Sequence, residues 1–556
     1  MYNARMTSLH IRINISERLL LVLSGIILIV SSTSCSLDWE TNVESGNRDG
    51  VLHYGNGDEP QEIDPHLTTG IPEFSIQLAL FEGVVSKHPS DLSIQPGVAE
   101  SWEISEDQLT YTFHFRDNAL WSNGDPVTAH DFVYSWERAL RPELGSLYSY
   151  MFTYIRNADK FFKGEIDDFN EVGIKALDAR ILQVQLKSAT PFFLQLLDHH
   201  SYYPVHPATI EKFGGMIKRG SQWSRPGNFV GNGSFVLKEW KLNRILTVEK
   251  SPTYWDRDTV KLNEIRFYPI SNRSTEERMF RAGQLHLTNR VPNEKIAWYR
   301  KNDPESLNIT AYLGTYFYRF NSKVVPLGDA RVRKALSMSI NRPQIVEHVT
   351  KGGQLPAYTF TPPNTDGFTS EAHVKYDIEG ARKLLAEAGF PDGKGFPKLE
   401  IIYNTDESHR MVAIAIQQMW KKALNIDVSL ANQDWQVYLE NESQGNYQIS
   451  RAAWIGDYLD ANNFLDMWLS NGGNNRTGWS NQEYDANIAA AAKTPDKQER
   501  FRLFQKNEQI LIDESPVMPI YTYTRVFLIS PSLKGWDENI LDQHPYKHAY
   551  LQSDEQ

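Results

Sequence analysis

Cysteine is almost absent from this chain, since Cys35 is the only one among 556 residues. An intramolecular disulfide needs two cysteines, so none can form. Zinc sites built on CxxC pairs and iron–sulfur clusters are excluded for the same reason. A catalytic thiol is excluded as well, because Cys35 precedes the part of the chain that is expected to fold.

Positive charge is also in short supply. The chain has 57 Lys and Arg against 69 Asp and Glu, which gives a formal net charge of −12. Such a chain lacks the basic face of a nucleic-acid binder and gives no support to electrostatic docking on anionic lipid. A hydrophobic fraction of 41% indicates a globular chain with a sizeable core, and an aromatic fraction of 12% suits the lining of pockets.

Only one long apolar run occurs, Leu19 to Val30, and its twelve residues are too few to span a bilayer of about 30 Å. It follows a basic start with Arg5, Arg12 and Arg18, and it precedes the small residues Ser31 to Ser34. This order is typical of a bacterial export signal, which we predict over residues 1–34. We expect the remainder of the chain to be soluble.

Cys35 directly after small residues resembles the acylation site of a bacterial lipoprotein. That pattern prefers leucine three residues before the cysteine, where this chain has Ser32. An ordinary cleaved signal followed by an incidental cysteine is the alternative. We expect a lipid on Cys35, and a polar tether over residues 35–50.

Helix and strand patterns are interspersed in the rest of the chain. Period-two alternation predicts strands around Leu109 to Phe115 and Leu182 to Leu186. Asp377 is placed to cap a helix that ends at Gly389, and a second apolar stripe runs from Val412 to Ala423. Val517 to Ile529 is β-rich. The mixture predicts an α/β or α+β chain with several lobes.

The common catalytic motifs are missing: there is no GxSxG elbow, Walker A loop, HExxH or GxGxxG after a strand. His199, His200 and His206 have a spacing that fits no standard zinc site. A Ser–His–Asp or two-carboxylate site dispersed over the sequence stays open. We expect no enzyme activity, no metal and no cofactor.

Several segments, in order, resemble the solute-binding proteins of bacterial peptide ABC transporters, most of all the oligopeptide-binding members. The ligand-facing loop of that family is similar to ISRAAWIGDYLDANNFL, Ile449 to Leu465. The other matching segments are Glu62 to Glu73, Ala99 to Leu140, Gly231 to Trp240, Ser251 to Asp256, Asp329 to Arg342 and Leu355 to Gly367.

The resemblance implies an α/β, two-lobed hinged periplasmic-binding-protein fold with an additional inserted subdomain, which closes around its ligand. The implied boundaries are residues 51–81, 205–312 and 524–556 for the first lobe, 82–204 for the inserted subdomain and 313–523 for the second lobe.

The resemblance also implies a site for the amino end of a peptide. Asp457 matches the family's aspartate that pairs with the free α-amino group, and a carboxylate is the right partner for a buried ammonium. The aromatic positions that surround the ligand are matched by Trp454, Trp435, Tyr148 and Tyr523.

Backbone groups are implied to hold the peptide as an added extended strand. Ala453 and Ile455 match the positions that pair with it from the second lobe, and Gly70 and Ile71 match the segment that pairs with it from the opposite lobe. Such pairing is indifferent to side chains.

At the carboxyl end, Arg451 and His409 match basic positions that relatives use for ligand ends or bridging waters. This chain departs from close relatives at three other positions. Glu442 stands where they have arginine, Thr350, beside Lys351, where they have a cleft lysine, and Arg319 where they have an acid. We therefore expect a rearranged carboxyl-end site, in which Glu442 repels a peptide carboxylate.

The resemblance implies a monomeric, non-enzymatic extracytoplasmic receptor, in the periplasm or on the cell surface. It would capture oligopeptides and deliver them to an ABC peptide permease in the membrane. Cell-wall peptide (murein tripeptide) or dipeptide binding within the same family is the first alternative. A secreted peptide hydrolase and a surface chaperone are others. No nucleic-acid partner is expected.

Overall fold

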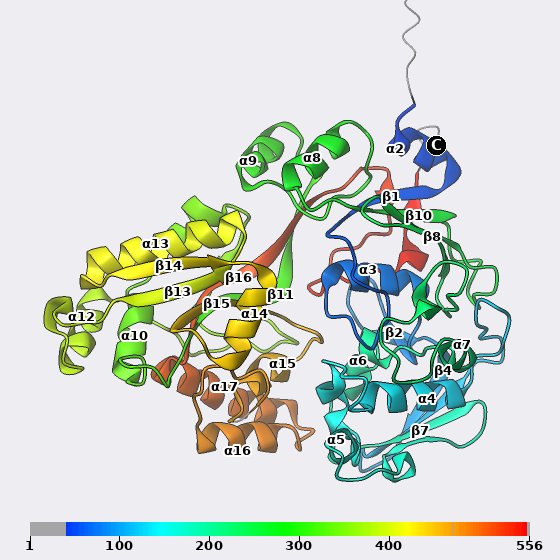
Figure 1. Cartoon of the computed structure of the whole chain (residues 1–556), viewed down its shortest axis with the longest axis horizontal. Helices are drawn as coiled ribbons and strands as arrows, with labels where there is room; N and C mark the ends of the chain where they lie inside the picture. The colour runs from blue at the N-terminus through cyan, green and yellow to red at the C-terminus, as the bar shows by residue number, and fades with distance from the viewer. Residues whose placement is uncertain (1–39, 471, 553–556) are drawn as a thin grey trace, which may run out of the picture. The chain divides into compact units, whose positions relative to one another are not determined.

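The computed structural model describes residues 40–470 and 472–552, and the chain from Asn42 onward forms one compact unit (Figure 1). The predicted signal peptide and Cys35 lie outside the described residues. Within the described part, no helix combines the length and apolar character that crossing a bilayer requires.

The first sheet contains four strands in the order β1, β10, β9, β8. These are β1 (Val51–Gly57), β10 (Glu264–Pro269), β9 (Ile245–Lys250) and β8 (Phe235–Lys241). β1 pairs in parallel with β10, and the other pairs are antiparallel. Helix α3 (Ile71–Leu80) shares its core, and so do Phe527, Tyr546 and Ala549 from the end of the chain.

The second sheet has the order β4, β5, β7, β6 and is antiparallel throughout. Its strands are β4 (Ala99–Ile104), β5 (Thr110–Phe115), β7 (Ile181–Gln185) and β6 (Ile174–Ala176). The predicted alternation is confirmed, because Tyr111, Phe113 and Phe115 are buried on one face. Helix α4 (Ala129–Leu140) begins with a capping box of Thr128 and Asp131 and buries Trp136 in the same core.

The third sheet has six strands in the order β12, β16, β11, β15, β13, β14. They are β12 (Leu355–Pro356), β16 (Val517–Leu528), β11 (Leu307–Phe320), β15 (Ile449–Ile455), β13 (Leu399–Asn404) and β14 (Val428–Gln433). Tyr316 and Tyr318 of β11 share a core with α10 (Ala330–Met338), α12 (Ile378–Glu387) and α13 (Glu407–Leu424).

The opposite face of the third sheet is covered by other helices. Leu313 and Phe317 of β11 share a core with α15 (Asn462–Leu465), α16 (Gln482–Ala491) and α17 (Lys497–Glu514). Alternate residues of β11 thus enter separate cores, as the pleat of a strand between two helical layers requires.

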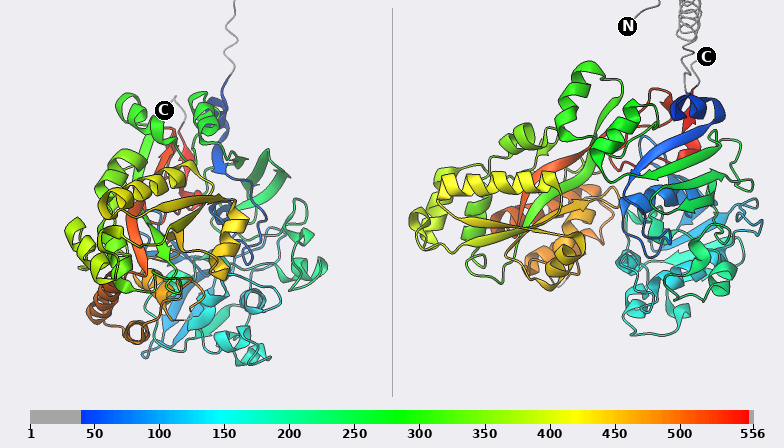
Figure 2. Two further views of the ribbon diagram at one scale, coloured as in Figure 1. Left: turned by 60° about the vertical axis from the view of Figure 1, so that its left-hand side comes forward. Right: turned by 45° about the horizontal axis from the view of Figure 1, so that its top comes forward.

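β11 and β16 are long antiparallel neighbours that continue from the third sheet toward the first (Figure 2). Beyond β16, Ile529 bridges Leu287, which in turn bridges Tyr54 of β1. The chain therefore passes between the two sheets along this pair. The lobe boundaries inferred from the sequence stay a prediction.

The predicted helices in the third sheet's layer are confirmed. Asp377 caps α12 by accepting the Gly380 N–H at 2.9 Å, and the helix ends before Gly389, whose φ is +97°. The second predicted stripe lies in α13, where Val412 and Ile416 are fully buried.

The tether expected over residues 35–50 is wrong for its last part. Asn42–Asp49 form helix α2, in which Gly46 is buried and the Val43 N–H donates to the Gly283 carbonyl at 2.9 Å. A Cβ at Gly46 would lie 2.4 Å from the Val51 carbonyl oxygen, so α2 packs closely against β1. The sequence did not indicate this close packing, because the segment is polar and has no periodicity.

The remaining elements are short or connect the layers. They are β2 (Val85–Lys87), β3 (Ile94–Pro96), η1 (Ser149–Tyr154), η2 (Phe169–Glu171), η3 (His200–Tyr202), η4 (Gln222–Ser224), η5 (Ile345–Thr350), η6 (Pro391–Gly393), η7 (Asp466–Trp468), η8 (Tyr546–His548), α5 (Ala158–Phe162), α6 (Phe193–Leu196), α7 (Pro207–Lys212), α8 (Arg273–Arg281), α9 (Asn293–Asn302), α11 (Arg342–Gln344), α14 (Trp435–Gln444), β17 (Leu533–Lys534) and β18 (Tyr550–Leu551).

Candidate functional site

The centre of the candidate site is an open edge of strand β15. β13 pairs with β15 only at Ile449 and Ser450, so the rest of β15 has no strand beside it on that side. On the other side, Gly456 donates to the Leu313 carbonyl at 2.7 Å. Hydrogen-bonded pairs alternate along an antiparallel ladder, which directs the N–H and C=O groups of Ala453 and Ile455 away from β11. Ala453 and Ile455 therefore present backbone groups at an open strand edge, and their pairing with a peptide stays a prediction.

Gly70 and Ile71 do not offer the same template. Gly70 is the N-cap of α3 and accepts the Phe74 N–H, while Ile71 is the first residue of the helix and accepts the Ser75 hydroxyl. Pairing of Ile71 with a peptide stays a prediction, because the backbone N–H groups in the first turn of α3 have no partner within the helix. Ile71 is 39% exposed, so its side chain can still contact a ligand.

Asp457 lies two residues beyond the end of β15 and has no cation paired with it among the described residues. Its side chain is only 13% exposed, and its neighbours are the Tyr150 hydroxyl at 3.4 Å and His199 Nε2 at 3.8 Å. No lysine or arginine within the described residues forms an ion pair with it. Burial raises the pKa of Asp457 to about 7, against smaller lowering effects from hydrogen bonds and from Lys87.

His199 presents an N–H to Asp457. Its Nδ1 accepts the Ser201 N–H at 3.3 Å, so the neutral ring carries its proton on Nε2, which faces the carboxylate. Burial lowers the pKa of His199 far below its usual value, so the ring brings no charge. Within the described residues no group of three or more His, Cys, Asp or Glu could hold a metal.

Asn463 connects Asp457 to its aromatic neighbour. Its Oδ1 accepts the Trp454 indole N–H at 2.9 Å and the Asp457 backbone N–H at 3.2 Å. Tyr148 packs edge-on against His199 with ring centroids 4.5 Å apart, and the charge of Asp457 adds to burial in raising the pKa of Tyr148. Trp454 and Tyr148 thus lie around the carboxylate, whereas the side chain of Trp435 is outside the described residues.

Arg451 carries a buried positive charge with neutral partners. It is 8% exposed, and it donates to Asn404 Oδ1 at 3.1 Å and to the Tyr523 hydroxyl at 3.0 Å. Its guanidinium lies 4.7 Å from the Tyr316 ring centroid, and its Nε has no acceptor among the described residues. Two separately predicted site residues, Arg451 and Tyr523, are therefore in direct contact.

His409 supplies no charge to this end of the site. Burial and the nearby Arg451 lower the pKa of His409 far below its usual value, so the expectation of partial charge at neutral pH is wrong. Its Nδ1 lies 3.4 Å from the Tyr316 hydroxyl, which leaves the ring available as a neutral hydrogen-bonding group.

Glu442 does not confront a ligand carboxylate, contrary to expectation. Its carboxylate is 4% exposed and is bound by the Arg319 guanidinium and by Arg476 at 2.8 Å. Ser450 Oγ at 2.8 Å and the Tyr438 hydroxyl at 3.0 Å also donate to it. Glu442 and Arg319, two of the positions at which the resemblance implied a rearranged site, are therefore the two halves of one ion pair, and Glu442 is already neutralised.

Thr350, the third of these positions, also makes contacts with residues nearby in the chain. Thr350 is 5% exposed and donates to Gln354 Oε1 at 2.8 Å, and Lys351 beside it is exposed with φ at +59°. Among the described residues, Lys351 forms no hydrogen bond or ion pair with Arg451 or His409.

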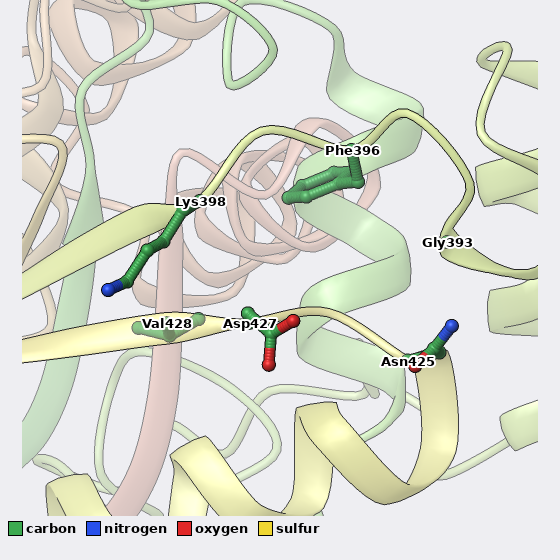
Figure 3. Close-up of a pocket in the computed structure, with 6 residues that line it drawn as sticks. All are labelled: Gly393, Phe396, Lys398, Asn425, Asp427 and Val428. Carbon is green, nitrogen blue, oxygen red and sulfur yellow. The ribbon is translucent and has the colours of Figure 1, made fainter.

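A cavity of about 600 Å³ lies elsewhere, at the start of β13 and β14 (Figure 3). It is lined by Gly393, Phe396, Lys398, Asn425, Asp427 and Val428. None of these residues belongs to the site around β15, so the cavity is not the candidate site.

Sequence reasoning missed several residues of the site: Tyr150, His199, Tyr316, Asn404 and Asn463. Asn463 stands in the matched ligand-facing loop, so its position was a usable signal. His199 was visible only as part of a histidine cluster without metal spacing.

The sequence model for the middle part of the bacterial extracellular solute-binding proteins, family 5, matches residues 93–476. The chain belongs to this family. The periplasmic oligopeptide-binding protein OppA of Salmonella typhimurium is 37% identical over 547 residues, covering 96% of this chain and 98% of that protein. The periplasmic murein peptide-binding protein MppA of Escherichia coli is 37% identical over 525 residues, covering 92% and 95%.

Solved structures of family 5 proteins agree with the fold. The murein tripeptide-binding protein MppA of Escherichia coli matches with a TM-score of 0.82 and 36% identity, over 90% of this chain and 98% of that one. Haemophilus influenzae OppA in complex with RPPGFSPFR matches with a TM-score of 0.81 and 35% identity, over 90% and 99%. The expected two-lobed α/β binding-protein class is confirmed, and the matched relatives are binding proteins.

We expect Glu442→Arg to lower the free energy of unfolding by roughly 3–5 kcal/mol, because it buries a third guanidinium beside Arg319 and Arg476. The double variant Arg319→Glu with Glu442→Arg should recover more than half of that loss, since an opposite pair is formed again. Urea unfolding followed by tryptophan fluorescence measures both. Glu387→Arg, at an exposed turn of α12, is the control and should change little. A double variant no more stable than the single one contradicts the pairing.

Proposed function

We propose that this protein is an extracytoplasmic receptor that binds oligopeptides by their free amino end and delivers them to an ABC peptide permease. The observation that carries the proposal is the Asp457 carboxylate, which is buried without a cation at the end of an open strand edge. A peptide α-ammonium supplies the missing charge, and its main chain satisfies the edge.

The carboxyl end of a peptide is complementary to Arg451. A buried guanidinium with only neutral partners and a free Nε favours a carboxylate, which can accept two of its N–H groups. The relatives support the same substrate class, since their names specify oligopeptide and murein peptide binding.

Binding of a murein tripeptide is the second candidate, because MppA is as similar to this chain as OppA is. Native mass spectrometry of the freshly purified protein distinguishes the two by the mass of any retained ligand. Recovery of an added peptide as intact molecules excludes the alternative of a peptide hydrolase.

The anchor is a separate part of the proposal. A short apolar run followed by small residues and a lone cysteine supports export and acylation at Cys35, which would hold the receptor beside its permease.

We expect Asp457→Asn to weaken the binding of a free peptide at least a hundredfold, which is about 2.7 kcal/mol. N-acetylation of the peptide should have a similar effect, because either change leaves one buried group without its opposite charge. Isothermal titration calorimetry with alanine peptides of two to six residues measures the affinity, and Asp427→Asn, at an exposed carboxylate, is the matched control. Unchanged affinity for acetylated peptide would remove the amino-end assignment.

Peptide affinity should fall with acidification. The ion pair needs ionised Asp457, whose pKa is about 7, so the carboxylate is available above that pH and its contribution to binding is lost as the pH falls through it. The α-amino group, with a pKa near 8, stays protonated over this range. We expect affinity at pH 5 to be roughly fifty to a hundred times lower than at pH 7.5. An N-acetylated peptide is the control, and an equally steep profile for it would contradict the mechanism.

Export should leave a lipid on Cys35. We expect the wild-type protein in the membrane fraction and Cys35→Ser in the soluble fraction, because one residue carries the anchor. Fractionation with intact mass measurement tests this. A soluble wild-type protein that begins at a residue after Cys35 would show an ordinary cleaved signal instead.

A further inference from the structure

A second carboxylate, Asp466, lies in the same surroundings as Asp457. It is partly exposed, and its Oδ2 accepts the Tyr154 hydroxyl at 3.2 Å and Asn462 Nδ2 at 3.0 Å. Both partners are neutral, and no lysine or arginine of the described chain forms an ion pair with it. The pKa of Asp466 is raised to about 7, mainly by burial and also by the charges of Asp457 and Asp460, against lowering effects of the hydrogen bonds from Tyr154 and Asn462.

The two carboxylates are held in the same way. Tyr150 and Tyr154 belong to the 3₁₀ helix η1, and each directs its hydroxyl to one of them. Both carboxylates also raise the pKa of Tyr150, so both lie near that ring.

An independent observation indicates a missing donor beside Asp466. Asn462 is 1% exposed, and its carboxamide touches Asp466 through Nδ2. Its Oδ1 has no hydrogen-bond donor among the described residues. A buried acceptor without a donor is costly, and an ammonium could donate to Asn462 Oδ1 and to Asp466 together.

The cations near Asp466 are already paired with other carboxylates. Asp460, its other acidic neighbour, is already paired with Arg500 at 2.9 Å. Lys87, the cation that acts on Asp457, is paired with Asp198 at 3.1 Å. Neither cation is therefore available to neutralise Asp466.

We infer that Asp466 and Asn462 form a subsite for a cationic side chain on the first residue of the peptide. The inference rests on the proposed function, with the α-amino group on Asp457. In lysine the α-nitrogen and Nζ are joined by six bonds of roughly 1.5 Å and can lie roughly 7 Å apart, so one residue can present an ammonium to each of two neighbouring carboxylates. The receptor therefore prefers peptides that begin with lysine or a similar diamino acid.

The test compares Lys-Ala-Ala with norleucine-Ala-Ala, which has the same side-chain carbon skeleton without the ammonium, by calorimetry at pH 7.5. We expect the lysine peptide to bind wild-type protein at least tenfold more tightly. A peptide with Nε-acetyl-lysine first should lose the advantage, which tests the charge without altering the protein. In Asp466→Asn the preference should fall below threefold, with norleucine-Ala-Ala affected little. Asp427→Asn, near the cavity of Figure 3, should retain the full preference.

Three results overturn the inference while leaving peptide binding in place. These are no preference for lysine in wild type, a preference that survives Asp466→Asn, or equal changes for both peptides in that variant. The last result would mean that Asp466 only ties Tyr154 to η7. Failure of every free peptide to bind would overturn the proposed function as well, so the two failures are distinguishable.

Discussion

The pairing of β11 with β15 on one side and β16 on the other is the constraint on which the site depends. β11 places Tyr316 beneath the guanidinium of Arg451 from β15, and β16 adds the Tyr523 hydroxyl on the same cation. The register that ends at Gly456 and Leu313 also turns the backbone of Ala453 and Ile455 outward and delivers Asp457 just beyond the strand. A shift of one residue would turn these groups to the other side.

Local signals in the sequence were sufficient for much of this architecture. The alternation in β5 and β7, the Asp377 cap of α12 and the stripe of α13 each involve residues within a few positions of one another. The loop around Asp457 was recognised because its residue types resemble one family's ligand-facing loop. Helix α2 was missed, since its polar sequence is stabilised by contacts with residues more than two hundred positions away, among them Gly283.

Electrostatic relations across the sheet were beyond sequence reasoning for the same reason. Glu442 and Arg319 are 123 positions apart, and each alone indicated an altered ligand site. They meet only because β11 and β15 are paired, which places Arg319 opposite Ser450, and Ser450 donates to Glu442. His409 was expected to carry partial charge, but burial and the proximity of Arg451 keep it neutral. A residue's type gives its possible charge, whereas its surroundings decide the actual charge.

Under the proposed function, the unpaired charges near the two ends of β15 constrain the direction in which the peptide runs. Asp457, beyond the end of the strand, lacks a cation, and Arg451, within it, lacks an anion. A zwitterionic peptide with its amino end at Asp457 and its carboxyl end toward Arg451 must run antiparallel to β15. The six residues from Arg451 to Asp457 extend roughly 20 Å. The side chains of these two residues shorten the distance that the peptide has to span. The pairing of main-chain groups at Ala453 and Ile455 then leaves side-chain choice open in the middle of the peptide. Selectivity is confined to its ends, where burial makes an unpaired charge costly.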